Sequence, residues 1–135
     1  VKGGTRLVAN ATHAFYQEFG HLICVDRLRR TPLLTKRAEA AAKKPRDKET
    51  IARIDTELRD CVVWRQKCEL VDGLALTPDH LVVGASGQVS LLDIETGETA
   101  WSANVNGHAH GIAIAEGRLL VSTDRGEISC FAPRD

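Results

Sequence analysis

The fold of this chain is decided by residues 74–92, LALTPDHLVVGASGQVSLL, because the same pattern returns twice. It recurs at 112–131 as IAIAEGRLLVSTDRGEISCF and, more loosely, at 7–25. Each copy reads as strand, turn, strand, glycine turn and strand, with the glycine turns at Gly20, Gly87 and Gly126. Apolar residues two and four positions after each glycine share one face of a strand. The last two glycines are about 39 residues apart, a repeat length typical of a β-propeller blade.

A second motif, DIETGETAW at 93–101, follows the middle copy. It resembles the pyrroloquinoline-quinone-like (PQQ-like) propeller repeat, in which an L-D-x-x-T-G-x-x-x-W pattern closes each blade. In that family the Thr-Gly pair turns the chain between the last two strands, and the tryptophan docks between neighbouring blades. Asp93, Thr96, Gly97 and Trp101 match this motif, and Trp64 stands at the tryptophan position of the preceding copy.

The expected fold is therefore mainly β: two to three antiparallel blades of a partial PQQ-like propeller, with an inserted α-helical hairpin. We expect a first partial blade at 1–30, the hairpin at 31–61 and the following blades at 62–135. Propellers usually close with four to eight blades, and the chain contains no methionine. We therefore expect a piece, the C-terminal blades, of a larger bacterial propeller protein. The alternative is a half-propeller that closes as a homo-oligomer.

The insertion has the signals of two helices. Thr31 and Pro32 resemble a helix start, and residues 36–44, KRAEAAAKK, favour a helix strongly. Pro45 ends it, and Asp47 is suited to cap a second helix. The expected result is a hairpin that projects from a blade edge.

Charge is distributed unevenly, although the formal net charge is zero. Between Arg27 and Lys48 there are nine Lys or Arg residues against Glu39 and Asp47. Three interpretations are open. The hairpin folds back on an acidic blade or docks on an acidic partner, or it binds a polyanion, or its charged side chains simply face solvent. We favour the solvated face. Nucleic acid is disfavoured because no aromatic residues are interleaved with the cations and the total charge is balanced.

The four cysteines do not have metal-site spacing. Cys24 and Cys130 occupy equivalent strand positions and are expected to be buried small apolar residues. Cys61 and Cys68 bracket the segment around Trp64, and a disulfide between them at the base of the hairpin remains open.

One histidine pair is the candidate metal site. His108 and His110 flank Ala109 just before a predicted strand, and Asp72 aligns with His110 in the preceding copy. Two histidines and a carboxylate suit a transition metal. The alternative is a set of polar loop residues whose hydrogen bonds are satisfied by neighbouring blades.

Catalytic machinery and a cofactor are not expected. Quinoprotein dehydrogenases of this fold hold their cofactor with adjacent cysteines, calcium-binding carboxylates and a stacking tryptophan. This chain has no adjacent cysteine pair, and both of its tryptophans are already assigned to blade docking. Nucleophile-elbow, P-loop and zinc-protease motifs are missing too.

The favoured function is a non-catalytic scaffold that binds a protein or another ligand within a larger bacterial protein. Its partners would be another protein, the remaining blades or a second copy of the chain, and no stretch is apolar enough to span a membrane. The alternatives are the C-terminal fragment of a quinoprotein-like enzyme and a metal- or haem-associated redox accessory protein. The family resemblance favours a periplasmic or exported location.

Overall fold

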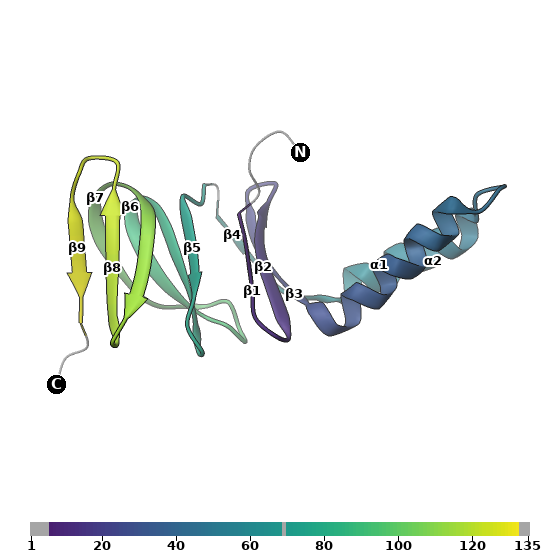
Figure 1. Cartoon of the computed structure of the whole chain (residues 1–135), viewed down its shortest axis with the longest axis horizontal. Coiled ribbons are helices and arrows are strands. Elements are labelled where there is room, and N and C mark those ends of the chain that lie inside the picture. Colours follow the sequence, from purple (N-terminus) through teal and green to yellow (C-terminus); the bar gives the residue numbers. More distant parts are fainter. Residues whose placement is uncertain (1–5, 69, 133–135) are drawn as a thin grey trace.

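The chain folds into two antiparallel sheets and one helical hairpin, as the expected fold class requires (Figure 1). The computed structural model describes residues 6–68 and 70–132. The first sheet is a complete four-stranded blade whose strands follow one another in sequence order: β1 (Leu7–Ala9), β2 (His13–Glu18), β3 (His21–Asp26) and β4 (Val62–Lys67).

The second sheet contains one complete blade and most of the next. Its elements are β5 (Gly73–Leu76), β6 (His80–Asp93), β7 (Thr99–Ala115), β8 (Arg118–Thr123) and β9 (Ile128–Phe131). The long β6 folds back on itself at Gly87, which has a φ of 75°. Its two ends therefore meet: the amide of Ile94, just after the strand, donates to the carbonyl of Asp79, just before it, at 3.4 Å. The first part of β7 pairs with β6 and the second part with β8. Thus β7 ends one blade and starts the next.

The two helices are inserted between β3 and β4: α1 (Arg27–Ala42) and α2 (Lys48–Asp60). The helix start predicted at Thr31 is wrong. The Asp26 carboxylate already accepts the Arg29 amide, so α1 begins at Arg27 and Pro32 lies inside it. The hairpin therefore occupies 27–60, and β4 completes the first blade instead of belonging to the blades that follow.

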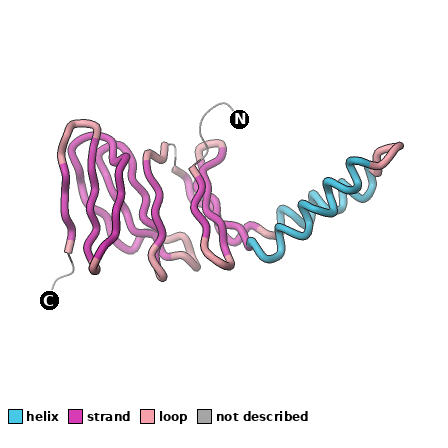
Figure 2. Tube along the Cα trace, viewed as in Figure 1, coloured by secondary structure: helices cyan, strands magenta, loops and turns pink. Residues whose placement is uncertain are grey.

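The hairpin packs mainly on itself. Ala40, Ile51 and Ile54 are buried, and Arg37 bonds Asp55 across the two helices at 2.6 Å. It points away from the sheets and touches them only near its base (Figure 2). The interpretation in which the hairpin folds back on an acidic blade is therefore wrong. None of the helices in the described residues combines the length and apolar character needed to cross a lipid bilayer.

Two apolar cores hold the blades face to face. One lies between the first and second blades and contains Phe15, Leu22, Cys24, Trp64, Val71, Leu81, Val83, Leu92 and Ile94. The other lies between the second and third blades and contains Val82, Val89, Ala109, Leu119 and Val121. The alternation of Leu81, Val82 and Val83 between the two cores shows that the second blade is buried on both faces.

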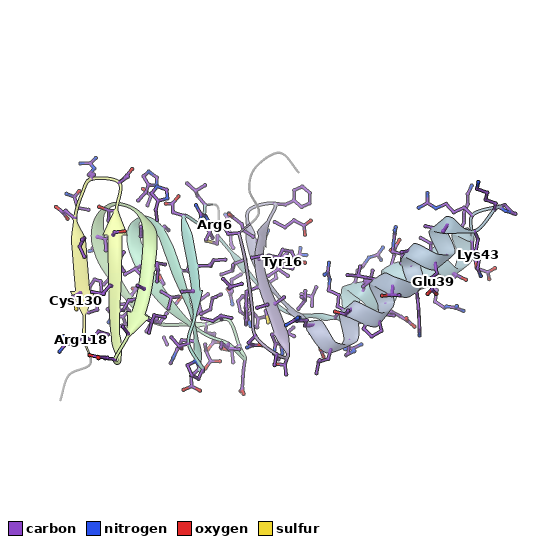
Figure 3. All side chains as sticks on the ribbon, viewed as in Figure 1. Arg6, Tyr16, Glu39, Lys43, Arg118 and Cys130 are labelled. Carbon is purple, nitrogen blue, oxygen red and sulfur yellow. The ribbon has the colours of Figure 1, made fainter. Side chains whose placement is uncertain are left out.

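The far face of the third blade is open. Ile128 is 76% exposed and Leu120 is 37% exposed. Cys130, the cross-strand neighbour of Leu120, is exposed as well and lies on the outermost strand (Figure 3). Its predicted burial is wrong, because it is on the face that points away from the second blade. Cys24 points toward the second blade and is fully buried.

The structure decides the question of a disulfide between Cys61 and Cys68, because both cysteines are free. The two residues lie at opposite ends of β4, a separation of about 20 Å along an extended strand. A disulfide requires Cα atoms within about 7 Å. The Cys61 thiol instead donates to the Glu57 carbonyl at 3.4 Å.

We predict that the hairpin can be removed without loss of the sheets. The Asp26 amide bonds the Cys61 carbonyl at 2.8 Å, so the two strand ends already lie close enough for a short turn. Replacing residues 28–60 with Asn-Gly should abolish the helical part of the circular dichroism spectrum and retain the β signal and a cooperative melt. Loss of cooperative melting would show that the hairpin is part of the core.

Candidate functional site

The candidate site begins at Asp72, which lies just before β5. Asp72 is 6% exposed and is the only buried charged side chain among residues 6–68 and 70–132. Its amide donates to the Gly84 carbonyl at 2.8 Å, which fixes its backbone against β6. A buried carboxylate requires a partner, and that partner comes from β7.

His108 is the partner of Asp72. Its Nδ1 atom lies 2.8 Å from the Asp72 Oδ2 atom. The ring of His110 stacks on that of His108 with centroids 5.8 Å apart and planes inclined by 20°. One ligand atom from each of the three residues lies within 4.8 Å of the others. The structure thus brings together the three residues that the sequence analysis selected.

A fourth residue, Asp124, holds the backbone of the site. Its carboxylate accepts the His108 amide at 2.8 Å, and its own amide donates to the His108 carbonyl at 3.2 Å. Gly107 is required beside it, since its φ is 106° and a Cβ would lie 2.5 Å from the Asp124 Oδ1 atom. Asp124 has no separate signal in the sequence, because the pattern of residues 124–126 predicts only a turn.

Glycines allow β7 to cross closely over the second blade. Gly73 and Gly84 face each other between β5 and β6, and a Cβ at Gly84 would overlap the Ala109 carbonyl. This close approach places Ala109 on the blade and its two flanking histidines next to Asp72. The position of the site is therefore set by backbone packing.

The electrostatics of the site favour positive charge. The hydrogen bond with Asp72, and then its charge, raise the pKa of His108 above the ordinary histidine value. The His108 amide lowers the pKa of Asp124 below its ordinary value, which keeps that carboxylate ionised. Two carboxylates on one histidine form a site suited to a cation.

The PQQ-like motif forms an inter-blade socket. The Asp93 carboxylate accepts the amides of Glu95 and Thr96, and the Asp93 carbonyl accepts the amide of Gly97. Trp64 of the first blade lies over this turn, and its indole Nε1 donates to a carbonyl of the same turn at 2.7 Å. Gly97 has a φ of 76°, and a Cβ there would overlap the Trp64 ring.

Trp101 is placed differently from Trp64. It is 37% exposed, and its ring meets the edge of Phe131 in the third blade with centroids 5.2 Å apart. The residues that would form its socket by analogy with the second blade begin at Ala132 and extend into 133–135, outside the described residues. The remaining motif glycines, Gly20 and Gly126, have φ values of 75° and 76° and form the expected hairpin turns.

A cleft of about 530 Å³ opens between the first two blades. Its walls come from β3 and β4 on one side and from β6, the following turn and the start of β7 on the other. They are lined by Leu22, Gln66, Lys67, Cys68, Val83, Ala85, Gln88, Ser90, Leu92, Gly97, Glu98 and Thr99. Burial raises the pKa of the Cys68 thiol, so this thiol is a poor nucleophile. The cleft has no signal in the sequence, because it depends on how two blades diverge.

Comparison with known proteins agrees with this architecture. Residues 47–135 match the family model described as outer membrane protein assembly factor BamB. The chain belongs to the BamB family of PQQ-like propellers. The expected family and fold class are thereby confirmed. No curated protein sequence matches the chain.

The crystal structure of BamB from Moraxella catarrhalis is similar in fold. The TM-score is 0.57 and the sequence identity 16%, with 93% of this chain and 32% of that chain covered. The chain thus spans about a third of the BamB structure. At this identity the similarity establishes the fold alone.

We predict that Trp64→Ala destabilises the chain far more than Trp101→Ala. Trp64 is 8% exposed and hydrogen-bonded, so its loss should reduce the free energy of unfolding by roughly 3–5 kcal/mol. The half-exposed Trp101 should contribute about 1–2 kcal/mol. Urea denaturation of the two variants measures the difference, and equal losses would contradict the assigned socket.

Proposed function

We propose that the chain is a non-catalytic segment of a larger bacterial PQQ-like propeller and acts there as a protein-interaction scaffold. The observation that carries this proposal is the projecting hairpin. The hairpin is folded and capped, yet the strands on either side of it already meet through the Asp26–Cys61 hydrogen bond. The sheet does not need this structured insertion, so the insertion is suited to contact another protein.

The chemistry of the hairpin surface indicates an acidic partner. Exposed cations outnumber exposed anions over the hairpin: Arg27, Arg29, Lys36, Lys43, Lys44, Arg46, Lys48, Arg53 and Arg59 against Glu39, Glu49, Glu57 and Asp60. Side chains extend outward along the hairpin, with Lys43 near its tip (Figure 3). Residues 27–60 contain no aromatic residue, so the stacking platform used for single-stranded nucleic acid is missing. An acidic protein surface is therefore the favoured partner.

The blades supply the rigid frame. Each inter-blade core fixes one sheet on the next, so the hairpin base on β3 and β4 has a defined position. We propose that a further blade of the same protein covers the open face formed by Leu120, Ile128 and Cys130. The three-fold greater length of the BamB structure supports this proposal.

We predict that contact with the partner depends on the charge of the hairpin. A photo-crosslinking amino acid replaces the exposed Leu34 in the full-length protein that contains this segment. Irradiation should then give one defined product, in which the hairpin is joined to its partner. Reversal of three exposed charges, Lys36→Glu, Lys44→Glu and Arg53→Glu, should abolish that product. The neutral Gln set serves as the matched control and should weaken the product less than the Glu set.

The scaffold proposal fails if no product forms at Leu34, or if the product survives charge reversal. Addition of nuclease distinguishes a protein partner from a nucleic-acid partner, because the crosslinked product would be lost on digestion if the partner were a nucleic acid. Retention of the circular dichroism spectrum by each variant excludes unfolding as the cause.

We predict that the open face of the third blade makes the isolated chain associate in solution. Light scattering at increasing concentration should show a monomer that then associates without a fixed size, through the apolar face. Leu120→Lys combined with Ile128→Lys should suppress the association. A discrete dimer or trimer at the lowest concentration would instead mean that copies of the chain cover the face.

A further inference from the structure

We infer that Asp72, His108 and His110 bind a divalent transition-metal ion, with Zn²⁺ as the representative, and that this ion clamps the second blade to the third. The inference is independent of the scaffold proposal. It starts from the three side chains whose ligand atoms lie within 4.8 Å of one another.

The donor set selects the class of ion. Two imidazole nitrogens and one carboxylate oxygen suit Zn²⁺, Cu²⁺ and Ni²⁺, whereas Ca²⁺ and Mg²⁺ prefer sites made of oxygen. Three protein ligands leave a fourth position for water on a tetrahedral zinc ion. Ligand atoms around such an ion lie about 3.4 Å apart, as its bond lengths of about 2 Å require. The Asp72 Oδ2 and His108 Nδ1 atoms, 2.8 Å apart, must therefore separate slightly, and ligand atoms that lie up to 4.8 Å apart must approach one another.

The imidazoles are accessible to an ion, while the backbone is held. The His108 side chain is 38% exposed and His110 is exposed, so an ion can reach both rings from solvent. The Asp124 carboxylate and the close packing of Ala109 on Gly84 keep the backbone in place. A fixed backbone lowers the ordering cost of binding.

The pair of histidines also suits a metal ion. Their ring centroids lie 5.8 Å apart, and a metal ion binds imidazoles in their neutral forms. Asp72 and Asp124 are the carboxylates that balance its charge.

The topology gives the ion a structural consequence. Asp72 directly precedes β5, the first strand of the second blade, and the histidines lie where β7 becomes the first strand of the third. These strands are neighbours, since Gly73 lies against the Ala109 and His110 carbonyls. An ion held by all three residues therefore joins the blades at the edge where their first strands converge.

The experiment is titration of the chelator-treated chain with Zn²⁺, followed by calorimetry and thermal melting. We expect one ion per chain and a melting temperature that rises with Zn²⁺ concentration, because the ion binds the folded state. His110→Ala should weaken binding at least tenfold and abolish the rise. His21→Ala, which changes an unrelated histidine near Phe19, should leave both unchanged.

Co²⁺ supplies a second readout at the ligands themselves. It should give visible absorption bands typical of four-coordinate nitrogen and oxygen ligation in the wild-type chain and in His21→Ala, but not in His110→Ala. Mg²⁺ should give no thermal shift. The clamp is overturned if Zn²⁺ does not bind, if His110→Ala binds it equally well, or if binding leaves the melting temperature unchanged.

Discussion

Burial of the apolar faces of the blades against one another is the constraint on which the rest of this structure depends. In the second blade, successive residues of β6 enter different cores: Leu81 and Val83 pack toward the first blade, and Val82 packs toward the third. A sheet with two apolar faces cannot be stable in water alone, so blades form by stacking. At the end of the stack one apolar face stays uncovered, as the exposed Leu120 and Ile128 show.

The same constraint explains why the insertion is tolerated. The helices enter between β3 and β4 at the end of the strands, away from the faces that other blades cover. Their own small core of Ala40, Ile51 and Ile54 satisfies their apolar side chains. The propeller can therefore carry a rigid appendage without a change in how its blades pack.

Two kinds of contact tie successive blades together beyond apolar packing. At the turn after β6, the Trp64 ring packs on Gly97 and its indole N–H donates to the Ile94 carbonyl. At the convergence of the first strands, His108 reaches back to Asp72. Both place a polar group of one blade against its neighbour, where an error of register would leave a buried polar group unsatisfied. The two contacts therefore define how the blades are arranged, and the apolar cores supply most of the stability.

The sequence by itself determined the strands, their glycine turns, the helical hairpin and the family. These depend on local properties: side-chain alternation, the positive φ of glycine and the spacing from Asp93 to Trp101. It also selected Asp72, His108 and His110, since alignment of two repeats places equivalent positions at equivalent strand ends. Only the tertiary structure decided that Cys130 is exposed, that Asp124 holds His108 and that a cleft opens beside Cys68. Each of these depends on which face meets a neighbouring blade and at what angle, and that is set by packing between segments far apart in the chain.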